Sequence, residues 1–221
     1  MKCPVCENSG CIGFMTVDKM DYLECSECLA VFLNPSLRLS PEEEFGRYRE
    51  HNNDPSDPAY RAFLGRLSGP LMERISPGMR GLDYGCGPGP ALAEVLREAG
   101  YQIDLFDPFF EPDVGVLQNK YDFIVCSEVA EHFHHPAREF ENMQGLLKPG
   151  GILGVMTCFL ADNTDFPGWH YRRDPTHVVF YRERTFHVIA ERQGWELSIP
   201  CANVAFLTRS ACRCGNGSMF L

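Results

Sequence analysis

The segment GLDYGCGPGP (81–90) has glycines at alternate positions directly after an apolar run that ends in an acid. Gly85, Gly87 and Gly89 lack side chains, so another group can approach the backbone there very closely. A proline then opens PALAEVLREAG (90–100), whose apolar spacing and closing glycine predict a helix. A strand, a glycine-rich turn and a helix in this order predict one unit of a parallel α/β sheet, with a ligand at the turn.

Strand-like and helix-like segments alternate through the rest of the chain. Strands are predicted over 80–86, 101–107, 121–128, 150–159, 196–199 and 203–209, and helices over 90–100, 136–147 and 183–194. This alternation predicts an α/β fold with a doubly wound, mostly parallel, Rossmann-like sheet. Ligands of such sheets bind outside the carboxyl ends of the strands, at the point where the strand order reverses.

Two C-x2-C pairs, CPVC (3–6) and CSEC (25–28), are separated by eighteen residues. Short strand-like runs lie between and after them, and this spacing is typical of a zinc ribbon. Four thiolates complete a tetrahedral zinc site and leave no position open for catalysis, so the predicted zinc ion is structural. The metal would replace the hydrophobic core that so short a segment cannot build, and we predict a zinc ribbon over residues 1–35. Its predicted ligands are Cys3, Cys6, Cys25 and Cys28.

Residues 36–76 are predicted to form a linker and an N-terminal helical segment ahead of the main domain, which spans 77–221. The first part of this segment is polar, as linkers are. Asp57, followed by a proline, is a typical helix start because its side chain can cap the first turn. Gly69 and Pro70 are expected to kink this helix or to split it in two.

The chain carries a formal net charge of −10, which makes it a poor candidate for non-specific binding to nucleic acid. No apolar run is long enough to span a bilayer, and no apolar leader fits between Met1 and Cys3. Several of the eleven cysteines lie in apolar runs, where a free cysteine behaves as a small hydrophobic residue, and the missing leader indicates a reducing compartment. We therefore expect a cytoplasmic protein.

The glycine turn differs from two common phosphate-binding loops. A nicotinamide-binding loop has the spacing G-x-G-x-x-G, whereas this turn reads D-x-G-x-G-x-G from Asp83. No G-K-[ST] follows, which excludes a P-loop. An acid at the mouth of the turn would repel a pyrophosphate and would suit a cation.

The turn resembles motif I of the class I S-adenosylmethionine-dependent methyltransferases. YDFIVCSEVAEHF (121–133) is similar to the fourth-strand motif of that family, and LLKPGGILGV (146–155) is similar to its turn into the fifth strand. The chain also resembles a bacterial family of zinc-ribbon methyltransferases of unassigned substrate. The resemblance lies in the ribbon, in DPFF (107–110) and in GWHYRRDPTHVVFY (168–181). The later part also resembles methyltransferases that act on hydroxylated quinol precursors. The resemblance implies that 77–221 is a methyltransferase domain.

The resemblance also implies which residues hold S-adenosylmethionine. Asp107, at the end of the second predicted strand, would accept hydrogen bonds from the ribose hydroxyls. The stretch from Asp107 to Tyr121 is too short for the helix and strand that the family usually has there, so Phe109 or Phe110 could cover the adenine instead. The predicted cofactor-binding residues are Asp83, Gly85, Cys86, Gly87, Gly89, Asp107, Pro108, Glu128 and Val129.

Methyl transfer requires the acceptor to be aligned with the methyl group, and it often requires a base. His132, just after the fourth predicted strand, is the first candidate for this base, and His177 is the second. His134 and His135 are expected to cap the next helix instead of binding a metal. Five side chains with suitable chemistry are predicted to contact the substrate. They are Tyr48, His51, Trp169, His170 and Arg172.

The predicted function is methyl transfer from S-adenosylmethionine to a small-molecule, lipid-like or carrier-bound acceptor. One alternative is an RNA methyltransferase that uses the ribbon to bind RNA. It would require Arg172, Arg173, Arg182 and the ribbon to form one positive surface beside the cofactor site. A second alternative is a non-catalytic binding or scaffold protein with the same fold, which only the shortened stretch after Asp107 favours.

Overall fold

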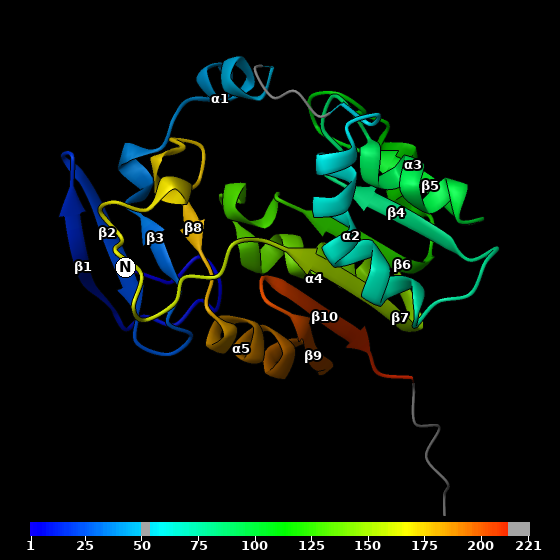
Figure 1. Cartoon of the computed structure of the whole chain (residues 1–221). Coiled ribbons are helices and arrows are strands. Elements are labelled where there is room, and N and C mark those ends of the chain that lie inside the picture. Colours follow the sequence, from blue (N-terminus) through cyan, green and yellow to red (C-terminus); the bar gives the residue numbers. More distant parts are fainter. Residues whose placement is uncertain (50–53, 212–221) are drawn as a thin grey trace, which may run out of the picture.

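The computed structural model describes residues 1–49 and 54–211. Two sheets organise these residues: a small antiparallel sheet near the N-terminus and a larger sheet flanked by helices (Figure 1). Within the described residues, no helix has both the length and the apolar character needed to cross a membrane.

The larger sheet has six strands in the order β5-β4-β6-β7-β10-β9. Its strands are β4 (Arg80–Tyr84), β5 (Gln102–Phe106), β6 (Tyr121–Ser127), β7 (Leu147–Met156), β9 (Trp195–Cys201) and β10 (Val204–Arg209). The first four in spatial order are parallel, and β10 is antiparallel to both of its neighbours. This arrangement confirms the predicted doubly wound, mostly parallel sheet.

The central strand β6 is apolar on both faces, as is typical of parallel strands that helices cover on both sides. Phe123 and Val125 point into a core with α2 (Pro58–Met72) and α3 (Ala91–Glu98). Ile124 and Cys126 point into a second core with α4 (Pro136–Leu146) and α5 (Glu183–Gln193). All four of these β6 side chains are fully buried.

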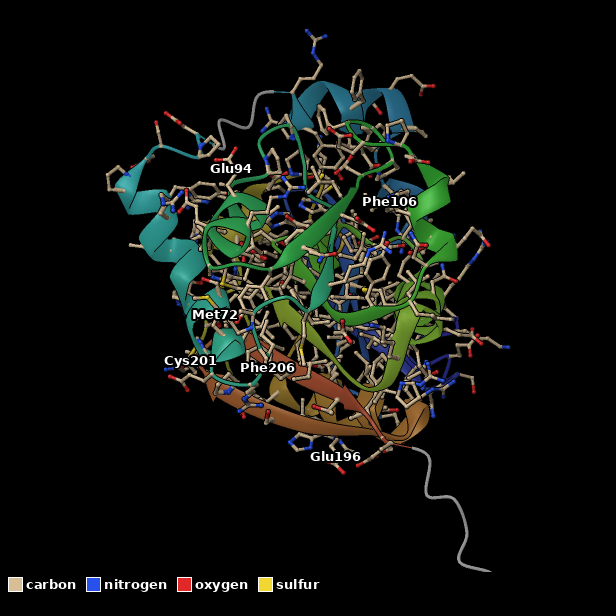
Figure 2. All side chains as sticks on the ribbon, turned by 90° about the vertical axis from the view of Figure 1, so that its right-hand side faces the viewer. Met72, Glu94, Phe106, Glu196, Cys201 and Phe206 are labelled. Atoms are coloured by element: carbon tan, nitrogen blue, oxygen red, sulfur yellow. The ribbon has the colours of Figure 1, made fainter. Side chains whose placement is uncertain are left out.

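Helix α2 is continuous, so the expectation that it splits at Pro70 is wrong. Asp57 caps its first turn by accepting a hydrogen bond from the Ala59 N–H at 2.8 Å. Pro70 lies in the last turn, where its missing N–H leaves only the Arg66 carbonyl without its helical donor. The Cys201 thiol, labelled in Figure 2, lies 3.6 Å from that oxygen and supplies a donor.

Part of the predicted linker is a helix. It contains the short 3-10 helix η1 (Pro35–Leu37) and α1 (Pro41–Tyr48). Ser40 accepts a hydrogen bond from the Glu43 N–H, and the Glu43 carboxylate accepts one from the Ser40 N–H, which together form a capping box. The sequence S-P-E-E therefore contained a helix-start signal that its polar composition obscured.

The segment between β5 and β6 contains the 3-10 helix η2 (Val114–Gln118) and no strand. This agrees with the expectation that the segment is too short for a full helix and strand. Strand β5 consequently forms the edge of the larger sheet in the described chain.

The ribbon is not a separate sheet. Its strands β1 (Cys11–Val17), β2 (Met20–Cys25) and β3 (Val31–Leu33) pair in antiparallel order, and β8 (Val179–Phe180) extends them as a fourth strand. Val31 of β3 pairs with Phe180, which lies in the segment predicted as the main domain. One continuous hydrophobic core includes the four cysteines, α4 and α5.

Candidate functional site

A cavity of about 730 Å³ lies at the carboxyl ends of β4, β5 and β6. This is the end at which doubly wound sheets bind ligands, and the volume is that of a site for a cofactor or small molecule. Its wall includes the glycine turn after β4, Phe106 at the end of β5 (labelled in Figure 2), and the segment after β6. Glu44 and Tyr48 of α1 line the same cavity, although the sequence had placed Glu44 in a linker.

The glycine turn takes backbone conformations that favour glycine. Gly85 has φ +85° and Gly87 has φ +64°. A Cβ added to Gly85 would lie 2.5 Å from a methyl group of Val129, so a side chain of this protein already fills the space there. The Gly85 N–H donates to the Phe106 carbonyl at 2.7 Å, which ties the turn to the end of β5.

Asp107 holds the turn from the other side. One of its carboxylate oxygens accepts the Gly87 N–H at 3.1 Å. The other accepts the N–H groups of Phe109 and Phe110 at 2.8 and 3.1 Å. Each carboxylate oxygen can accept about two hydrogen bonds, so the capacity that remains is on the oxygen that faces Gly87.

Asp83 is buried at the base of the cavity. Burial raises the pKa of this carboxyl to about 7, with a smaller contribution from Asp107, whereas Arg97 lowers the pKa. A carboxylate in this position favours a positively charged ligand.

Four aromatic rings form one group, and three of them, Tyr48, Phe109 and Phe110, line the cavity. Phe45 stacks on Phe109 with ring centroids 5.4 Å apart and lies 6.0 Å from Phe110. Tyr48 lies 5.5 Å from Phe109, so α1 adds two rings to the pair that the sequence had suggested for the adenine. Phe45 was missed because α1 was predicted as linker.

The two predicted bases lie together, and a third residue joins them. The short helix η3 (Ala130–His132) follows β6 and carries Glu131 and His132, and His177 approaches from the segment before β8. The His132 and His177 ring centroids are 4.7 Å apart. One potential ligand atom from each of the three residues lies within 4.8 Å of the other two. We call this group the Glu-His-His cluster.

Burial determines the electrostatics of the cluster. Glu131 is fully buried, and burial raises the pKa of its carboxyl. Burial also lowers the pKa of His177, although the nearby Glu131 opposes this change. Glu131 was not among the predicted site residues, because its only signal was its place just before His132 and after a predicted strand.

Glu128 lies at the end of β6 with φ +53°, an uncommon conformation for a residue other than glycine. Its N–H donates to the Met156 carbonyl at 2.7 Å, which holds this backbone in place. Burial raises the pKa of its carboxyl to about 8, and Glu131 adds to the effect. Strained backbone of this kind is concentrated at functional sites.

Most of the predicted site residues line the cavity, including every predicted cofactor residue and both predicted bases. They are Tyr48, Asp83, Gly85, Cys86, Gly87, Gly89, Asp107, Pro108, Glu128, Val129, His132 and His177. The predicted substrate residue His51 lies outside the described part of the chain.

Three predicted substrate residues are placed elsewhere. Of the described residues that line the cavity, none is Trp169, His170 or Arg172. The Trp169 ring packs against Tyr171 and Phe180 at 5.2 and 5.6 Å. Arg172 is buried and donates to the carboxylate of Asp18 in the ribbon at 3.0 Å. Arg172 and Trp169 therefore contact the ribbon sheet, whereas His170 is exposed and its ring lies 6.3 Å from that of Tyr171.

Two of the three arginines named for RNA binding are paired with acids. Arg172 pairs with Asp18, and Arg182 pairs with Glu24 and Asp162 at 3.3 and 2.9 Å. The side chains of Arg172 and Arg182 are only 7% and 14% exposed. Their charges are therefore neutralised between the ribbon and the larger sheet.

The four cysteines of the ribbon form a buried group. Cys3 Sγ lies 3.6 Å from Cys28 Sγ, and Cys6 Sγ lies 3.5 Å from Cys25 Sγ. Zn–S bonds of about 2.3 Å in a tetrahedron separate the sulfurs by about 3.8 Å. The N–H groups of Val5 and Cys6 point at Cys3 Sγ, as donors to a thiolate do. The donor set and its geometry therefore fit a structural zinc ion.

Comparisons with known proteins agree with this fold. The profile of a family described as "Methyltransferase domain" (Methyltransf_23) matches residues 48–198. The ubiquinone biosynthesis O-methyltransferase of Xylella fastidiosa strain M23 is 32% identical over 111 residues, covering 39% of this chain and 45% of that protein. The chain thus spans about half the length of the curated relatives it matches first. The enzyme of the same name from Coxiella burnetii strain Dugway 5J108-111 is 25% identical over 177 residues, covering 67% of this chain and 74% of that protein.

A solved structure shares the architecture. Magnesium protoporphyrin IX methyltransferase from Synechocystis PCC 6803, solved with bound SAH, superimposes with a TM-score of 0.51 at 15% identity, covering 77% of this chain and 95% of that chain. At this identity the likeness concerns the fold alone. Because the family profile covers more than half of the sequence, from α1 to β9, the chain belongs to this family of methyltransferase domains.

Proposed function

We propose that the protein transfers a methyl group from S-adenosylmethionine to a hydroxyl oxygen of a small-molecule acceptor. One observation carries the proposal: a single cavity joins the glycine turn at one end to the Glu-His-His cluster at the other. When bound, S-adenosylmethionine supplies a methyl group on a positively charged sulfur. The residues of the chain must bind this cation, orient the acceptor and accommodate the proton that the acceptor loses.

The cofactor end of the cavity has the chemistry that such a cation requires. Asp83 supplies a buried carboxyl group, and the glycine turn lines the same cavity. Asp107 can accept one ribose hydroxyl on its oxygen near Gly87, because backbone N–H groups already occupy the other oxygen. This modifies the expectation that Asp107 holds both ribose hydroxyls. The rings of Phe109 and Phe110 lie where a flat base could stack.

The acceptor end is assigned to the Glu-His-His cluster. The cluster lies beyond Glu128 in the same cavity, and Tyr48 meets the His132 ring edge-on at 5.2 Å. The aromatic wall and the buried acid favour an apolar or aromatic acceptor that carries a hydroxyl group. The names of the matching relatives support oxygen as the acceptor atom, since both are O-methyltransferases of ubiquinone biosynthesis.

The first test is titration calorimetry of the zinc-loaded protein with S-adenosylmethionine and with S-adenosylhomocysteine, with NAD as the control. We expect binding of both sulfur compounds and none of NAD. Asp107→Ala should weaken binding strongly because the glycine turn loses its anchor at Gly87. Absence of binding by a folded, zinc-loaded protein would refute the proposal and favour a scaffold role.

The second test addresses the acceptor. The protein would be incubated with S-adenosylmethionine carrying a deuterated methyl group and with matched phenols, catechols and anilines, and the products would be read by mass spectrometry. We expect label on the phenols or catechols. Transfer only to the anilines would refute the choice of oxygen while leaving the methyltransferase activity intact.

A further inference from the structure

We propose that Glu131, His132 and His177 bind a divalent transition-metal ion within the cavity, as a second metal site separate from the four cysteines. The two groups are distinct in position and in chemistry: the ribbon site has four thiolates, and this one has two imidazoles and a carboxylate. Metal binding by the cluster does not depend on the proposed function. The role of the metal toward the acceptor, given below, rests on it.

The geometry of the cluster is close to that of a metal site. The three potential ligand atoms lie within 4.8 Å of one another. Ligands about 2.0–2.2 Å from a metal ion are separated by roughly 3–4 Å, so a small contraction around an ion would complete the site. Two of the ligands are adjacent in η3, and the third arrives from a distant part of the chain.

Glu131 provides an independent reason to expect a cation. Its side chain is fully buried, and among the described residues neither carboxylate oxygen makes a hydrogen bond of good geometry. The hydroxyl groups of Tyr171 and Thr157 lie close enough to favour the charged form. They share one hydrogen bond of 3.0 Å, so only one of their two protons remains for the carboxylate. A buried carboxylate with so little compensation is costly, and a bound cation would offset that cost.

The histidines are held in the form that metal ligands adopt. His132 Nδ1 lies 3.0 Å from the Thr176 carbonyl, and His177 Nδ1 lies 2.7 Å from the Tyr171 carbonyl. A carbonyl oxygen only accepts, so each Nδ1 carries the proton and the lone pair is on Nε2. Histidine ligands of metals characteristically donate their second N–H to a carbonyl or a carboxylate in this way.

The segment that supplies those carbonyls is itself fixed. Asp174 accepts hydrogen bonds from the N–H and the hydroxyl of Thr176 at 2.9 and 2.6 Å, which closes a tight turn before His177. The next residue, Val178, donates its N–H to the Glu131 carbonyl at 2.9 Å. The turn and η3 are thus connected on both sides of the cluster, so the three side chains are positioned before any ion binds.

Two imidazoles and one carboxylate suit Zn²⁺, Fe²⁺, Mn²⁺ or Co²⁺, and not Mg²⁺ or Ca²⁺, which take mainly oxygen ligands. Three protein ligands leave at least one position open toward the cavity. An acceptor hydroxyl bound there loses its proton to water more readily. The oxygen then attacks the methyl carbon, the sulfur–carbon bond breaks, and the sulfur leaves as a neutral thioether.

The test counts metal ions in the full-length protein. Wild type and variants would be saturated with Zn²⁺, freed of excess by gel filtration, and analysed by elemental mass spectrometry. We expect two zinc ions per wild-type chain, one for each of the two ligand groups, and one in Glu131→Gln and in His177→Gln. The matched control is His134→Gln, because His134 lies two residues beyond His132 but pairs with Glu44 at 2.7 Å and is outside the cluster. It should keep both ions.

A second measurement identifies the ligands. Protein that keeps zinc in its ribbon would be titrated with Co²⁺, and the absorption of the cobalt would be recorded. Cobalt in the cluster has only nitrogen and oxygen ligands, so we expect weak visible bands and no intense thiolate charge-transfer band. His177→Gln should abolish the weak bands.

One zinc ion per wild-type chain, or two in both cluster variants, would overturn the proposal and leave the cluster as a proton acceptor only. Calorimetry with S-adenosylhomocysteine separates this result from failure of the proposed function. Two ions without cofactor binding would support the metal site and refute the methyltransferase. Cofactor binding with one ion per chain would support the methyltransferase and refute the metal site. A variant that also loses its ribbon zinc has not folded, and the other variant then decides.

Discussion

The ribbon sheet and the larger sheet achieve stability in different ways. In the larger sheet, the side chains of β6 from Phe123 to Cys126 are fully buried between two layers of helices. In the ribbon, β3 has three residues, β8 has two, and Ile12 and Met15 of β1 are 61% and 39% exposed. The larger sheet is held by packing, whereas the ribbon has short strands, exposed apolar side chains and a buried group of four cysteines that fits a zinc ion.

This difference matters for the cavity because the two sheets share a segment. Val178 donates to the Glu131 carbonyl, and its own carbonyl accepts the Leu33 N–H of the ribbon at 2.9 Å. The Thr185 hydroxyl of α5 donates to the carbonyl of the zinc-ligand residue Cys28 at 2.9 Å. The ribbon therefore supports the backbone that carries His177 and is not merely an appended module.

Removing the ribbon zinc is expected to have the largest effect. Zinc binding contributes about 10 kcal/mol or more to the folding of small zinc domains, so Cys25→Ser should unfold β1 to β3. Hydrogen exchange should then accelerate in the ribbon and also in β8, while β6 stays protected. Peptide-resolved hydrogen exchange checks this. Unchanged protection of β8 would show that the two regions are independent.

The second-largest effect is expected from truncating one buried ring in the ribbon sheet and one in the larger sheet. Phe180→Ala in β8 and Phe206→Ala in β10 both remove fully buried rings, and each should destabilise the protein by about 3–5 kcal/mol. Phe180 packs on Tyr22 and Phe166, so only its truncation should also weaken zinc retention. Denaturant unfolding and competition with a zinc chelator measure the two effects. Equal zinc retention in both variants would contradict the coupling.

Stability and cofactor affinity are both expected to depend on pH through Asp83, which is buried at the base of the cavity. The folded-state pKa of Asp83 is raised to about 7, so its contribution to stability is present at low pH and is lost as the pH rises through 7. Ionisation of the same carboxyl should strengthen the binding of a cationic cofactor. Between pH 6 and 7.5, stability should fall slightly and affinity for S-adenosylmethionine should rise. In Asp83→Asn, both trends should disappear, as measured by thermal unfolding and calorimetry.

The smallest effect is expected at the surface between the two regions. Arg192 of α5 pairs with Glu7 of the ribbon at 3.0 Å, and both side chains are about half exposed or more, at 47% and 61%. Exposed ion pairs contribute less than about 1 kcal/mol. Arg192→Ala should therefore leave the midpoint of denaturant unfolding nearly unchanged. A large loss would mean that surface charge, and not the shared core, attaches the ribbon.

Several features were predictable because their signals are local. The zinc ligands follow from cysteine spacing, the order of strands and helices follows from apolar patterns, and the glycine turn follows from residues that lie within one loop. Helix α1 had a local signal as well, the capping box from Ser40 to Glu43, and it was missed because the surrounding residues are polar. Phe45, the α1 ring that stacks on Phe109, was missed for the same reason.

The fold class, the grouping of the four cysteines and the glycine turn could be predicted from sequence, because each depends on residues that are close together in the chain. That β8 joins the ribbon, and that Glu131, His132 and His177 meet, became evident only in the folded structure. The same structure decided that Arg172 binds Asp18 and lies apart from the cavity. These contacts join segments that are far apart in sequence. Their pairing depends on packing across the whole molecule, and a short sequence motif carries no information about such packing.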